Sequence, residues 1–320
     1  MNSDPFFSIL IPTYQAGHYL GNAIRSVLDQ DYVDYEMIVV DDGSADDTEK
    51  LVESICDARL RYFSIAHGGT QNARYWGAKR ARGKYLVFLD ADDELTPYAL
   101  RNIYARLLQY PCDLYIGGMY LDDGNGDPAL LNDEFPEGYC TRNDLFKKMT
   151  DERLIKTLAR KVVRREAAQY QDPFIREHTM SYGEDMFYSM DMLLSVQTVY
   201  FSREMMYIYH LHEDSTMHRF YCDKYRDRIL MSHAIQHYGD LLGICREDTE
   251  RIARVYLTKS LADCLLELDQ APLSDISEKE KVRIRSEIVN VLSKNVPAIR
   301  RYSDKYLPVQ AEILRRYRIC

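Results

Sequence analysis

Hydrophobic and polar positions in the first third of the chain follow two alternating patterns. Short runs rich in β-branched and aromatic residues lack polar alternation, as expected of strands covered on both faces. Between these runs, apolar residues recur every three or four positions, which indicates amphipathic helices. Strands that alternate with helices predict βαβ units and a mostly parallel sheet. The predicted strands are residues 6–11, 35–40, 60–65 and 85–89, and the predicted helices are residues 19–29, 48–56 and 70–82.

The rest of the chain predicts a change of architecture. Residues 113–120 read as a further strand, and residues 121–138 are rich in Gly, Asp, Asn and Pro, which predicts a long loop. A helix is expected to begin near Thr96-Pro97. From residue 221 onward helical patterns dominate, and Ser277 followed by Glu280 predicts a helix cap after a break at Pro272.

Three polar motifs, IPTY, DDGS and DADD, follow predicted strands. Ligands of such sheets bind beyond the carboxyl ends of the strands, so we expect the motifs to converge on one edge. In DDGS, Gly43 permits a tight turn after Asp41 and Asp42. The motif is typical of a polar helix cap, and its carboxylates can also accept a hydrogen bond from a nucleobase. In DADD, Asp90 and Asp92 are hard oxygen ligands suited to Mg²⁺ or Mn²⁺, although such pairs also occur in solvated loops.

Two further motifs lie on predicted helices. The helix at residues 70–82 is basic. Arg74 is expected to face an anionic ligand, and the other basic residues of the helix are expected to face water. Glu184 and Asp185 begin another helix, where the helix dipole favours carboxylates. The same pair can supply a general base for a hydroxyl.

A cluster of histidines and hydroxyls occurs in YIYHLHEDSTMH. His210 and His212 have the spacing of residues on one face of a strand, with Ser215 close in sequence. Such groups can bind a pyrophosphate or a metal, while two histidines alone are weak evidence for a zinc site.

Composition narrows the class of protein. The chain has 320 residues, 46% of them hydrophobic, and a formal net charge of −9, which argues against a nucleic-acid partner. Its seven cysteines include no CxxC pair, which favours free thiols in a reducing compartment. The N-terminus lacks the pattern of a signal peptide, and no stretch approaches the about 20 apolar residues of a membrane span. We therefore expect a cytoplasmic protein.

The motifs taken together resemble those of family 2 glycosyltransferases of the GT-A fold, of the bacterial cell-surface polysaccharide type. SILIPTYQAGHYLGNAIRSVLDQDYVDYEMIVVDDGSADDT, GGTQNAR and GKYLVFLDADDELTP carry this resemblance over residues 6–97. It returns at Gly183-Glu184-Asp185 and over residues 207–216. The implied fold is a Rossmann-like α/β domain, with a mostly parallel sheet flanked by helices, at residues 1–220. A helical C-terminal region is expected at residues 221–320.

The resemblance also implies roles for individual residues. Asp185, beside Glu184, is implied as the catalytic base. Asp41 is implied to contact the base of the nucleotide, and YHLHEDST resembles a flap that contacts the diphosphate. The DxD equivalent is implied to hold the ribose and a Mn²⁺ or Mg²⁺ ion, and the candidate metal ligands are Asp90, Asp92, Asp93 and His212. The residues expected to bind the nucleotide-sugar are Pro12, Thr13, Tyr14, Asp41, Asp42, Gly43, Arg74, Asp90, Ala91, Asp92, His210 and Ser215.

Two positions depart from the pattern of the family. Tyr75 stands where the family usually has an asparagine, and His210 stands where many members carry an arginine. A histidine is charged only when its pKa is raised, so the interaction of His210 with phosphate is expected to depend on pH.

The expected activity is an inverting, metal-dependent transfer of a hexose from a UDP-sugar to a hydroxyl of a glycan or lipid-linked acceptor. A catalytically inactive glycan-binding or scaffold protein on the same fold is the alternative, against which the intact Asp90, Asp92 and Asp185 argue. A nucleotidyltransferase is disfavoured because the N-terminus lacks a Gly-rich, Lys-bearing signature.

The C-terminal tail, residues 294–320, interleaves basic residues with aromatic and aliphatic ones. Such a segment suits a peripheral contact with the inner face of an anionic membrane. It equally suits helices that pack on the protein's own acidic body or in a homodimer, since Pro297 and Pro308 interrupt any long amphipathic helix.

Overall fold

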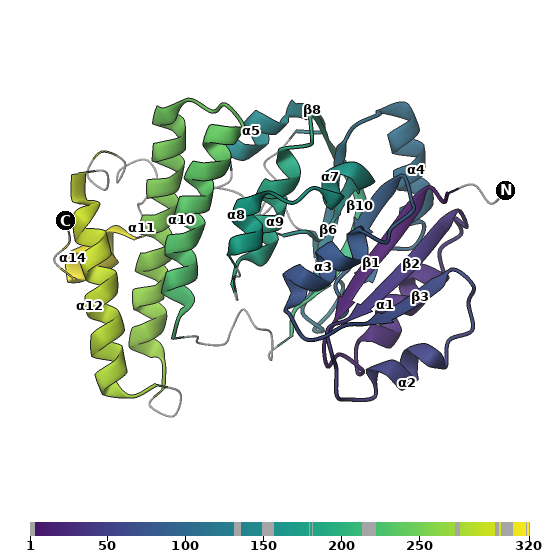
Figure 1. Ribbon diagram of the computed structural model, residues 1–320, viewed down its shortest axis with the longest axis horizontal. Helices are drawn as coiled ribbons and strands as arrows, with labels where there is room; N and C mark the ends of the chain where they lie inside the picture. The colour runs from purple at the N-terminus through teal and green to yellow at the C-terminus, as the bar shows by residue number, and fades with distance from the viewer. Residues whose placement is uncertain are drawn as a thin grey trace. The chain divides into compact units, whose positions relative to one another are not determined.

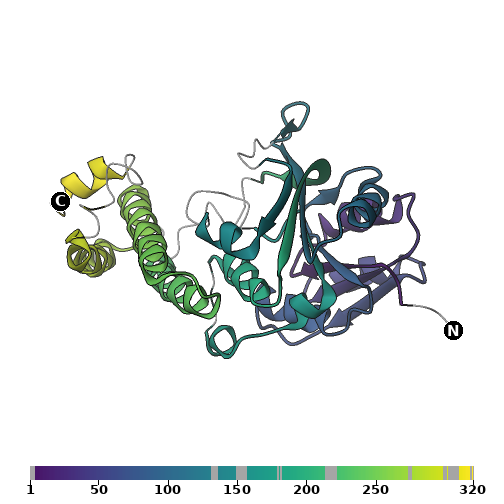
Figure 2. The same cartoon turned by 90° about the horizontal axis from the view of Figure 1, so that it is seen from above.

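A computed structural model describes most of the chain, which divides into two compact units (Figures 1 and 2). The sheet unit comprises Met1–Leu145, Leu154–Thr179 and Glu184–His212, and the helical unit comprises Phe146–Arg153, Met180–Gly183 and Glu213–Cys320. The domain boundary expected at residues 220 and 221 stays a prediction, and the helical unit takes in residues 213–220 as well as two short segments earlier in the chain. The described residues are 4–130, 136–148, 157–178, 180, 182–212, 222–272, 276–297, 301, 310–317 and 319.

One sheet forms the centre of the sheet unit, with strand order β3-β2-β1-β4-β9-β6-β10-β5. β1 to β4 pair in parallel, as the βαβ pattern predicts, whereas β9 runs antiparallel to both β4 and β6. β7 pairs with β6, and β8 pairs with β10. The strands are β1 (Phe7–Thr13), β2 (Tyr35–Asp41), β3 (Leu60–Ser64), β4 (Tyr85–Phe88), β5 (Glu94–Leu95), β6 (Leu114–Asp122), β7 (Ala129–Leu130), β8 (Gly138–Thr141), β9 (Lys161–Arg164) and β10 (Thr198–His210).

Helices cover both faces of this sheet (Figure 1). Ile9 of β1 belongs to a core cluster that also holds apolar residues of α1 and α4. Leu10 points to the other face, where Gly77 lets α3 approach closely, because a Cβ there would lie 2.2 Å from a Leu10 methyl. Both faces of β1 are therefore buried, which explains why its sequence lacks polar alternation. The helices are α1 (Leu20–Leu28), α2 (Thr48–Glu53), α3 (Thr70–Ala78), α4 (Ala99–Gln109), α5 (Arg142–Lys147), α7 (Arg165–Gln169), α8 (Pro173–Glu177) and α9 (Glu184–Leu193).

Four helices make up most of the described helical unit, and α11 contacts each of the other three. Buried side chains occur on several sides of α11, including Ile252, Tyr256 and Leu261, because α10 and α12 pack against it from different directions. The predicted cap is confirmed, since the Glu280 amide donates to the Ser277 hydroxyl at 3.3 Å. These helices are α10 (Lys224–Leu241), α11 (Arg246–Gln270), α12 (Glu278–Lys294) and α14 (Ala311–Arg316).

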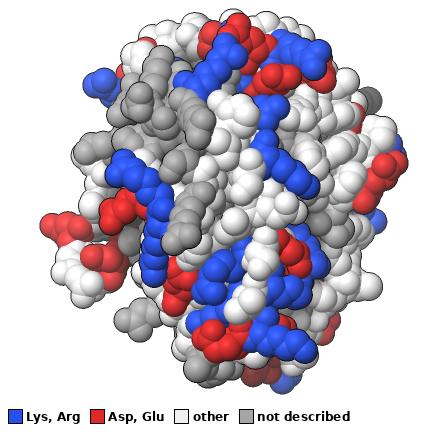
Figure 3. Space-filling view, turned by 90° about the vertical axis from the view of Figure 1, so that its left-hand side faces the viewer, with Lys and Arg blue, Asp and Glu red and all other residues white. Residues whose placement is uncertain are grey.

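The described part of the basic tail contacts acidic residues of α11. Arg301 lies 2.7 Å from Glu247, and Arg316 lies 3.3 Å from Asp269. Figure 3 shows one face of the molecule on which basic and acidic side chains lie next to one another. These pairs support packing of the tail on the protein's own acidic residues. Membrane contact and dimerisation stay predictions, and within the described ranges no helix combines the length and apolarity needed to cross a bilayer.

Two segments differ in detail from the sequence-based expectation. The helix expected near Thr96-Pro97 begins at Ala99, because Glu94 and Leu95 first form β5 against β10. The loop expected at residues 121–138 starts two residues late, because β6 runs to Asp122, and it folds back on β6 through β7. A two-residue strand such as β7 leaves no readable periodicity in a sequence.

Candidate active site

The carboxyl ends of neighbouring strands bring the three polar motifs of the sequence together. Thr13 ends β1 and pairs in register with Asp41, which ends β2. Asp90 follows β4, the other neighbour of β1. The hydroxyl of Thr13 is buried and has no hydrogen-bond partner among the described residues, as expected of a group that meets a ligand.

Asp41 is almost fully buried, with an exposed fraction of 2%. One of its carboxylate oxygens accepts from the amide of Ser44 at 2.9 Å, and the other accepts from the hydroxyl of Tyr62 at 2.6 Å. Gly43, which directly precedes Ser44, has a φ of 78°, a left-handed conformation that glycine adopts without strain. The turn that follows β2 is therefore fixed before any ligand arrives.

Asp42 anchors the start of α3. Its two oxygens accept from the amides of Gly68 and Gly69, both at 2.8 Å, and Nδ1 of His67 lies 2.9 Å from Oδ2. The ring of His67 stacks on Tyr14 with 4.5 Å between centroids, and Tyr14 is 46% exposed. An open aromatic surface therefore lies beside the ends of β1 and β2, while Pro12 is buried within β1.

The four carboxylates of the DADDE segment lie in different environments. Asp92 is exposed and Asp90 is half-buried, whereas Asp93 has an exposed fraction of 1%. Asp93 accepts from the hydroxyl of Tyr207 at 2.7 Å and from the amide of His210 at 3.0 Å. Burial and the neighbouring aspartates raise the pKa of Asp93 well above its usual value. Asp93 thus holds β10 against the loop, and Asp92 remains open to a ligand.

Arg74 joins the DADD loop to the acidic pair on α9. Its Nη2 donates to Asp90 at 2.8 Å, its Nη1 donates to Asp185, and Oε1 of Glu184 lies 4.0 Å from Nη1. The guanidinium has an exposed fraction of 3%. Burial alone acts to lower the pKa of Arg74, but the surrounding carboxylates raise it, so the group stays protonated. This buried cation is the positive partner that a cluster of carboxylates at a strand end requires.

Glu184 and Asp185 begin α9, as predicted. Oδ2 of Asp185 also accepts from the amide of Leu158 at 3.1 Å, so each of its oxygens has one donor. Burial and the charge of Asp185 raise the pKa of Glu184 to about 7. Burial likewise raises the pKa of Asp90 to about 6, against the opposing effect of Arg74.

The histidines of β10 lie near the DADD loop. His210 ends β10 with Nδ1 3.0 Å from Asp122 and Nε2 3.2 Å from Glu94. His212 lies just beyond the strand, with Nε2 3.5 Å from the backbone oxygen of Asp92. Ser215 lies outside the described residues. The described ranges contain no preformed group of three or more His, Cys, Asp or Glu side chains arranged to hold a metal.

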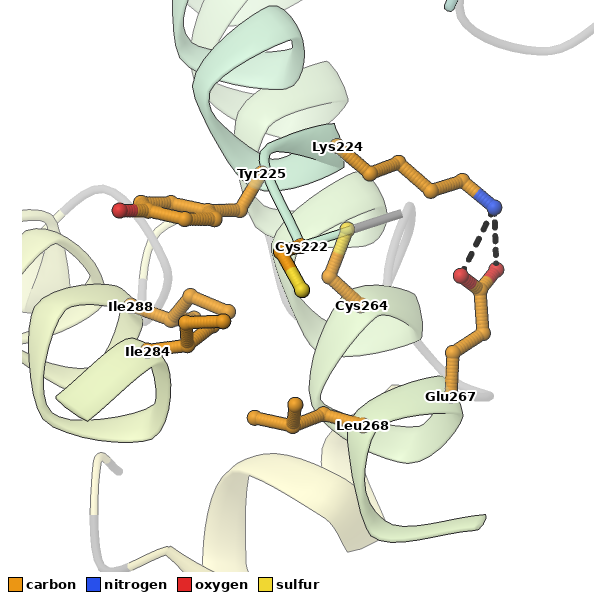
Figure 4. A pocket seen from close by; sticks show the side chains of 8 residues that line it. All are labelled: Cys222, Lys224, Tyr225, Cys264, Glu267, Leu268, Ile284 and Ile288. Carbon is orange, nitrogen blue, oxygen red and sulfur yellow. Dashed lines mark hydrogen bonds and ion pairs between the residues drawn. The ribbon is translucent and has the colours of Figure 1, made fainter. Parts of the chain in front are cut away.

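A pocket in the helical unit lies away from these motifs in the sequence (Figure 4). Its two charged residues satisfy each other, since Nζ of Lys224 donates to both oxygens of Glu267 at 2.9 and 2.7 Å. It offers no free charge for a nucleotide. Its lining residues are Cys222, Lys224, Tyr225, Cys264, Glu267, Leu268, Ile284 and Ile288.

Several residues of the site have no signal in the sequence. Three donors to the site carboxylates come from distant segments of the chain. They are the hydroxyl of Tyr62, the backbone amide of Leu158 and the hydroxyl of Tyr207. The tyrosines read as ordinary strand residues, and their partners are 21 and 114 positions away. His67 precedes a Gly-Gly turn, which was the one local indication of a special backbone.

Comparison with known proteins gives a consistent family. Residues 8–170 match the profile of Glycosyl transferase family 2. The chain is 23% identical over 301 residues to Glycosyltransferase GlyA of Streptococcus pneumoniae, covering 91% of this chain and 42% of that protein. It is 26% identical over 325 residues to the uncharacterized glycosyltransferase EpsJ of Bacillus subtilis, covering 98% and 90%. The chain therefore spans less than half of GlyA and most of EpsJ.

A shorter match agrees with this family, and solved structures share the fold. The Bacillus subtilis protein TuaG, a putative teichuronic acid biosynthesis glycosyltransferase, is 30% identical over 178 residues, or 55% of this chain and 69% of that protein. The crystal structure of S. aureus TarS 1-349 in complex with UDP-GlcNAc has a TM-score of 0.64 at 20% identity, covering 98% of this chain and 88% of that one. The complex of TarS 1-349 with UDP has a TM-score of 0.62. The structural likeness shows a shared fold.

Proposed function

The chain belongs to glycosyl transferase family 2, and on this premise we propose that it transfers a hexose from a UDP-sugar to a hydroxyl of a glycan or lipid-linked acceptor. The observation that carries the proposal is the bridge by Arg74. One buried guanidinium holds both Asp90, on the donor side, and Asp185, on the acceptor side. This contact supports the proposal, because it brings the proposed donor-binding and base residues to one cation.

The proteins that this chain resembles support the proposed donor and the proposed biosynthetic role. The fold neighbour TarS was solved with UDP-GlcNAc and with UDP, and TuaG carries a name that refers to teichuronic acid. We infer a UDP-sugar donor and a role in the synthesis of a bacterial cell-surface polysaccharide. The proposed place of action is the cytoplasm, with the inner face of the membrane as the site of any lipid-linked acceptor.

Asp185 is the proposed general base. It accepts the proton of the acceptor hydroxyl while the oxygen attacks the anomeric carbon, and the bond from that carbon to the diphosphate breaks, releasing UDP. One displacement from the opposite face inverts the anomer. Arg74 and the Leu158 amide each occupy one lone pair of Asp185, which fixes the direction of the carboxylate and leaves lone pairs for the hydroxyl.

The donor set fits a divalent metal that is shared with the substrate. Mg²⁺ and Mn²⁺ sites of this kind use one or two carboxylates and take their remaining ligands from phosphates and water. The exposed Asp92 and the half-buried Asp90 meet that description, and His212 lies beside Asp92. Both oxygens of Asp93 already accept hydrogen bonds, so its proposed role is to support the loop. Bound there, the ion would offset charge on the departing diphosphate.

The nucleotide is proposed to lie across the ends of β1 and β2. The exposed ring of Tyr14, backed by His67, offers a face for stacking on a base. The unpartnered hydroxyl of Thr13 and the carboxylate of Asp41 offer polar contacts beside it. The diphosphate would then extend toward the DADD loop and His210. His210 lies at the end of β10, with its ring nitrogens close to Glu94 and Asp122.

A thermal-shift screen of nucleotides with and without Mn²⁺ tests the proposal. We expect UDP to raise the melting temperature in the presence of Mn²⁺ and EDTA to abolish the effect. Release of UDP from a panel of UDP-sugars, even by slow hydrolysis, then identifies the donor. No response to any nucleotide would overturn the proposal and favour a glycan-binding protein on the same fold.

A further inference from the structure

Lys161 begins β9 and is buried, with an exposed fraction of 1%, yet the chemistry proposed above does not use it. Its Nζ donates to the backbone oxygen of Thr157 and, at 2.8 Å, to the hydroxyl of Ser189. A buried ammonium is costly unless it is paired and hydrogen-bonded. These two contacts connect the side chain to the surroundings of Asp185, the proposed base. Thr157 precedes Leu158, whose amide contacts Asp185, and Ser189 lies on α9, the helix that carries Asp185.

The first partner belongs to the turn that contacts Asp185. The amide of Leu158 donates to Oδ2 of Asp185 at 3.1 Å, and the amide of Lys161 closes the turn by donating to the carbonyl of Leu158 at 3.2 Å. Arg160 within the turn has a φ of 60°, a left-handed conformation that is unfavourable for arginine. Such a backbone persists when surrounding contacts fix it. The bond from Lys161 to Thr157 is one of them.

The second partner lies on the helix that carries Asp185. Ser189 follows Asp185 by four positions on α9, so the two side chains lie one turn apart on the same face. Lys161 itself is fixed by β9, which pairs with both β4 and β6 in the middle of the sheet. Its side chain thus joins three parts: the central sheet, the turn at Leu158 and the base-bearing helix.

We propose that Lys161 is a positioning residue for Asp185, holding the Leu158 amide against the carboxylate of the base. The inference rests on the proposed function of Asp185. Arg74 and Leu158 reach the two carboxylate oxygens from different elements, so losing either donor frees the carboxylate to rotate. Burial lowers the pKa of Lys161 to about 7, although the negative charge of Asp185 acts to raise it. Lys161 and Asp185 therefore interact electrostatically.

The test compares three variants of the full chain. Lys161→Met removes the ammonium and keeps an unbranched stem, and Ser189→Ala removes the hydroxyl that accepts from Lys161 without changing charge. Lys281→Met is the matched control, because Lys281 is also buried and donates to a backbone oxygen, that of Ala271, in the helical unit. The two readouts are hydrogen exchange of peptides covering residues 157–160 and the hydrolysis of UDP-GlcNAc, or of the UDP-sugar that the wild type turns over fastest.

In Lys161→Met we expect faster exchange at residues 157–160 and a fall in kcat of about 10- to 100-fold, the scale of a base displaced by a fraction of an ångström to about 1 Å. KM for the UDP-sugar should stay unchanged, and Ser189→Ala should give a smaller change of the same kind. Lys281→Met should change neither readout.

Unchanged exchange at residues 157–160 would overturn the inference, as would faster exchange with an unchanged kcat. A loss shared equally between kcat and KM would also count against it, because it would indicate general loosening of the site. If the wild type hydrolyses no UDP-sugar, the proposed function fails, and the exchange measurement still decides whether Lys161 holds the turn.

Discussion

The guanidinium of Arg74 donates one hydrogen bond to Asp185 and a second, 2.8 Å long, to Asp90. The three residues come from α3, the start of α9 and the loop after β4. Burial strengthens this arrangement, because little water competes for the ion pairs, and it makes the cost of removing one member large. The bridge therefore couples the position of the proposed base to that of the proposed metal ligand.

Arg74→Lys tests the bridge. A lysine keeps the charge but cannot donate from a planar fork to two carboxylates in different directions. We expect kcat/KM for UDP-sugar turnover to fall by about 100-fold or more, the lower end of the effect of truncating a buried charge pair. Arg80→Lys, on the exposed part of the chain after the same helix, should leave turnover unchanged. Wild-type kinetics in Arg74→Lys would show that charge alone suffices.

Asp92→Ala tests the metal assignment. The carboxylate is exposed, so its loss should leave the fold and the melting temperature of the free protein unchanged. We expect Mn²⁺-dependent UDP binding, measured by calorimetry, to disappear. The exposed Asp240 of the helical unit provides the control, and Asp240→Ala should bind UDP as the wild type does. Undiminished Mn²⁺ dependence in Asp92→Ala would mean that the ion is held elsewhere.

Asp185→Asn separates binding from transfer. The amide can keep a contact with the Leu158 amide through its oxygen, but it cannot take a proton at neutral pH. We expect UDP binding within a few-fold of wild type and a fall in turnover of about 10²- to 10⁴-fold, as is typical for loss of a general base. The measurement is UDP release at saturating donor. Turnover close to wild type would point to Glu184 as the base.

The sequence predicted the sheet unit well because its signals are local. β1 and β2 are buried on both faces, so their sequences lack polar alternation, whereas the segment between them has the periodicity of a helix. The ends of the strands, and the polar motifs at those ends, could therefore be located from the sequence. Asp41, Asp90 and Asp185 could be singled out for the same reason, since each lies at or within two residues of the end of an element. The short pairing of β5 with β10 could not be predicted, because it depends on residues more than 100 positions apart.

The hydrogen-bond and ion-pair partners of the site residues could not be predicted from the sequence for a related reason. Arg74 was expected to face an anionic ligand, and the structure places it between Asp185 and Asp90, 111 and 16 positions away. The nucleotide contact expected for Asp42 stays a prediction, and its carboxylate accepts from the amides of Gly68 and Gly69, contacts that the sequence did not indicate. Which of several carboxylates meets a cation depends on tertiary packing, and no spacing rule encodes it.

Glu184 gives a prediction about stability and pH. Its pKa is raised from 4.5 to about 7 in the folded chain, so the folded state holds this proton more tightly than the unfolded state. The stability that protonation contributes is complete below about pH 4.5 and is lost as the pH rises through about 7. Above that pH, the ionised Glu184 lies beside Asp185 in a partly buried site and destabilises the fold.

Glu184→Gln should therefore raise the melting temperature at pH 8 by about 1–2 °C, equivalent to roughly 1 kcal/mol for a chain of 320 residues. At pH 4.5 the difference should nearly vanish, because Glu184 is then protonated in the folded state and about half protonated in the unfolded state of the wild type. Glu53→Gln, at an exposed position of α2, is the control and should show no such pH dependence. A difference that is equal at both pH values would contradict the raised pKa.

Tyr207, on β10 between β6 and β5, contacts two aspartates of the DADD loop. Its hydroxyl donates to Asp93 at 2.7 Å and accepts from the amide of Asp90 at 3.0 Å. The ring is fully buried in β10, so both bonds form away from water. The direction in which Asp90 and Asp92 point is therefore set in part by a residue that does not itself reach the ligand.

Tyr207→Phe removes that hydroxyl and leaves the Asp90 amide and a buried Asp93 carboxyl without their partner. We expect a loss of about 1–3 kcal/mol in the free energy of unfolding and about tenfold weaker Mn²⁺-dependent UDP binding. Tyr85→Phe is the matched control, because Tyr85 is also buried and its hydroxyl donates to the backbone oxygen of Cys112 at 2.9 Å. That variant should lose similar stability and keep its UDP affinity, so equal affinities in the two variants would show that Tyr207 supports only the fold.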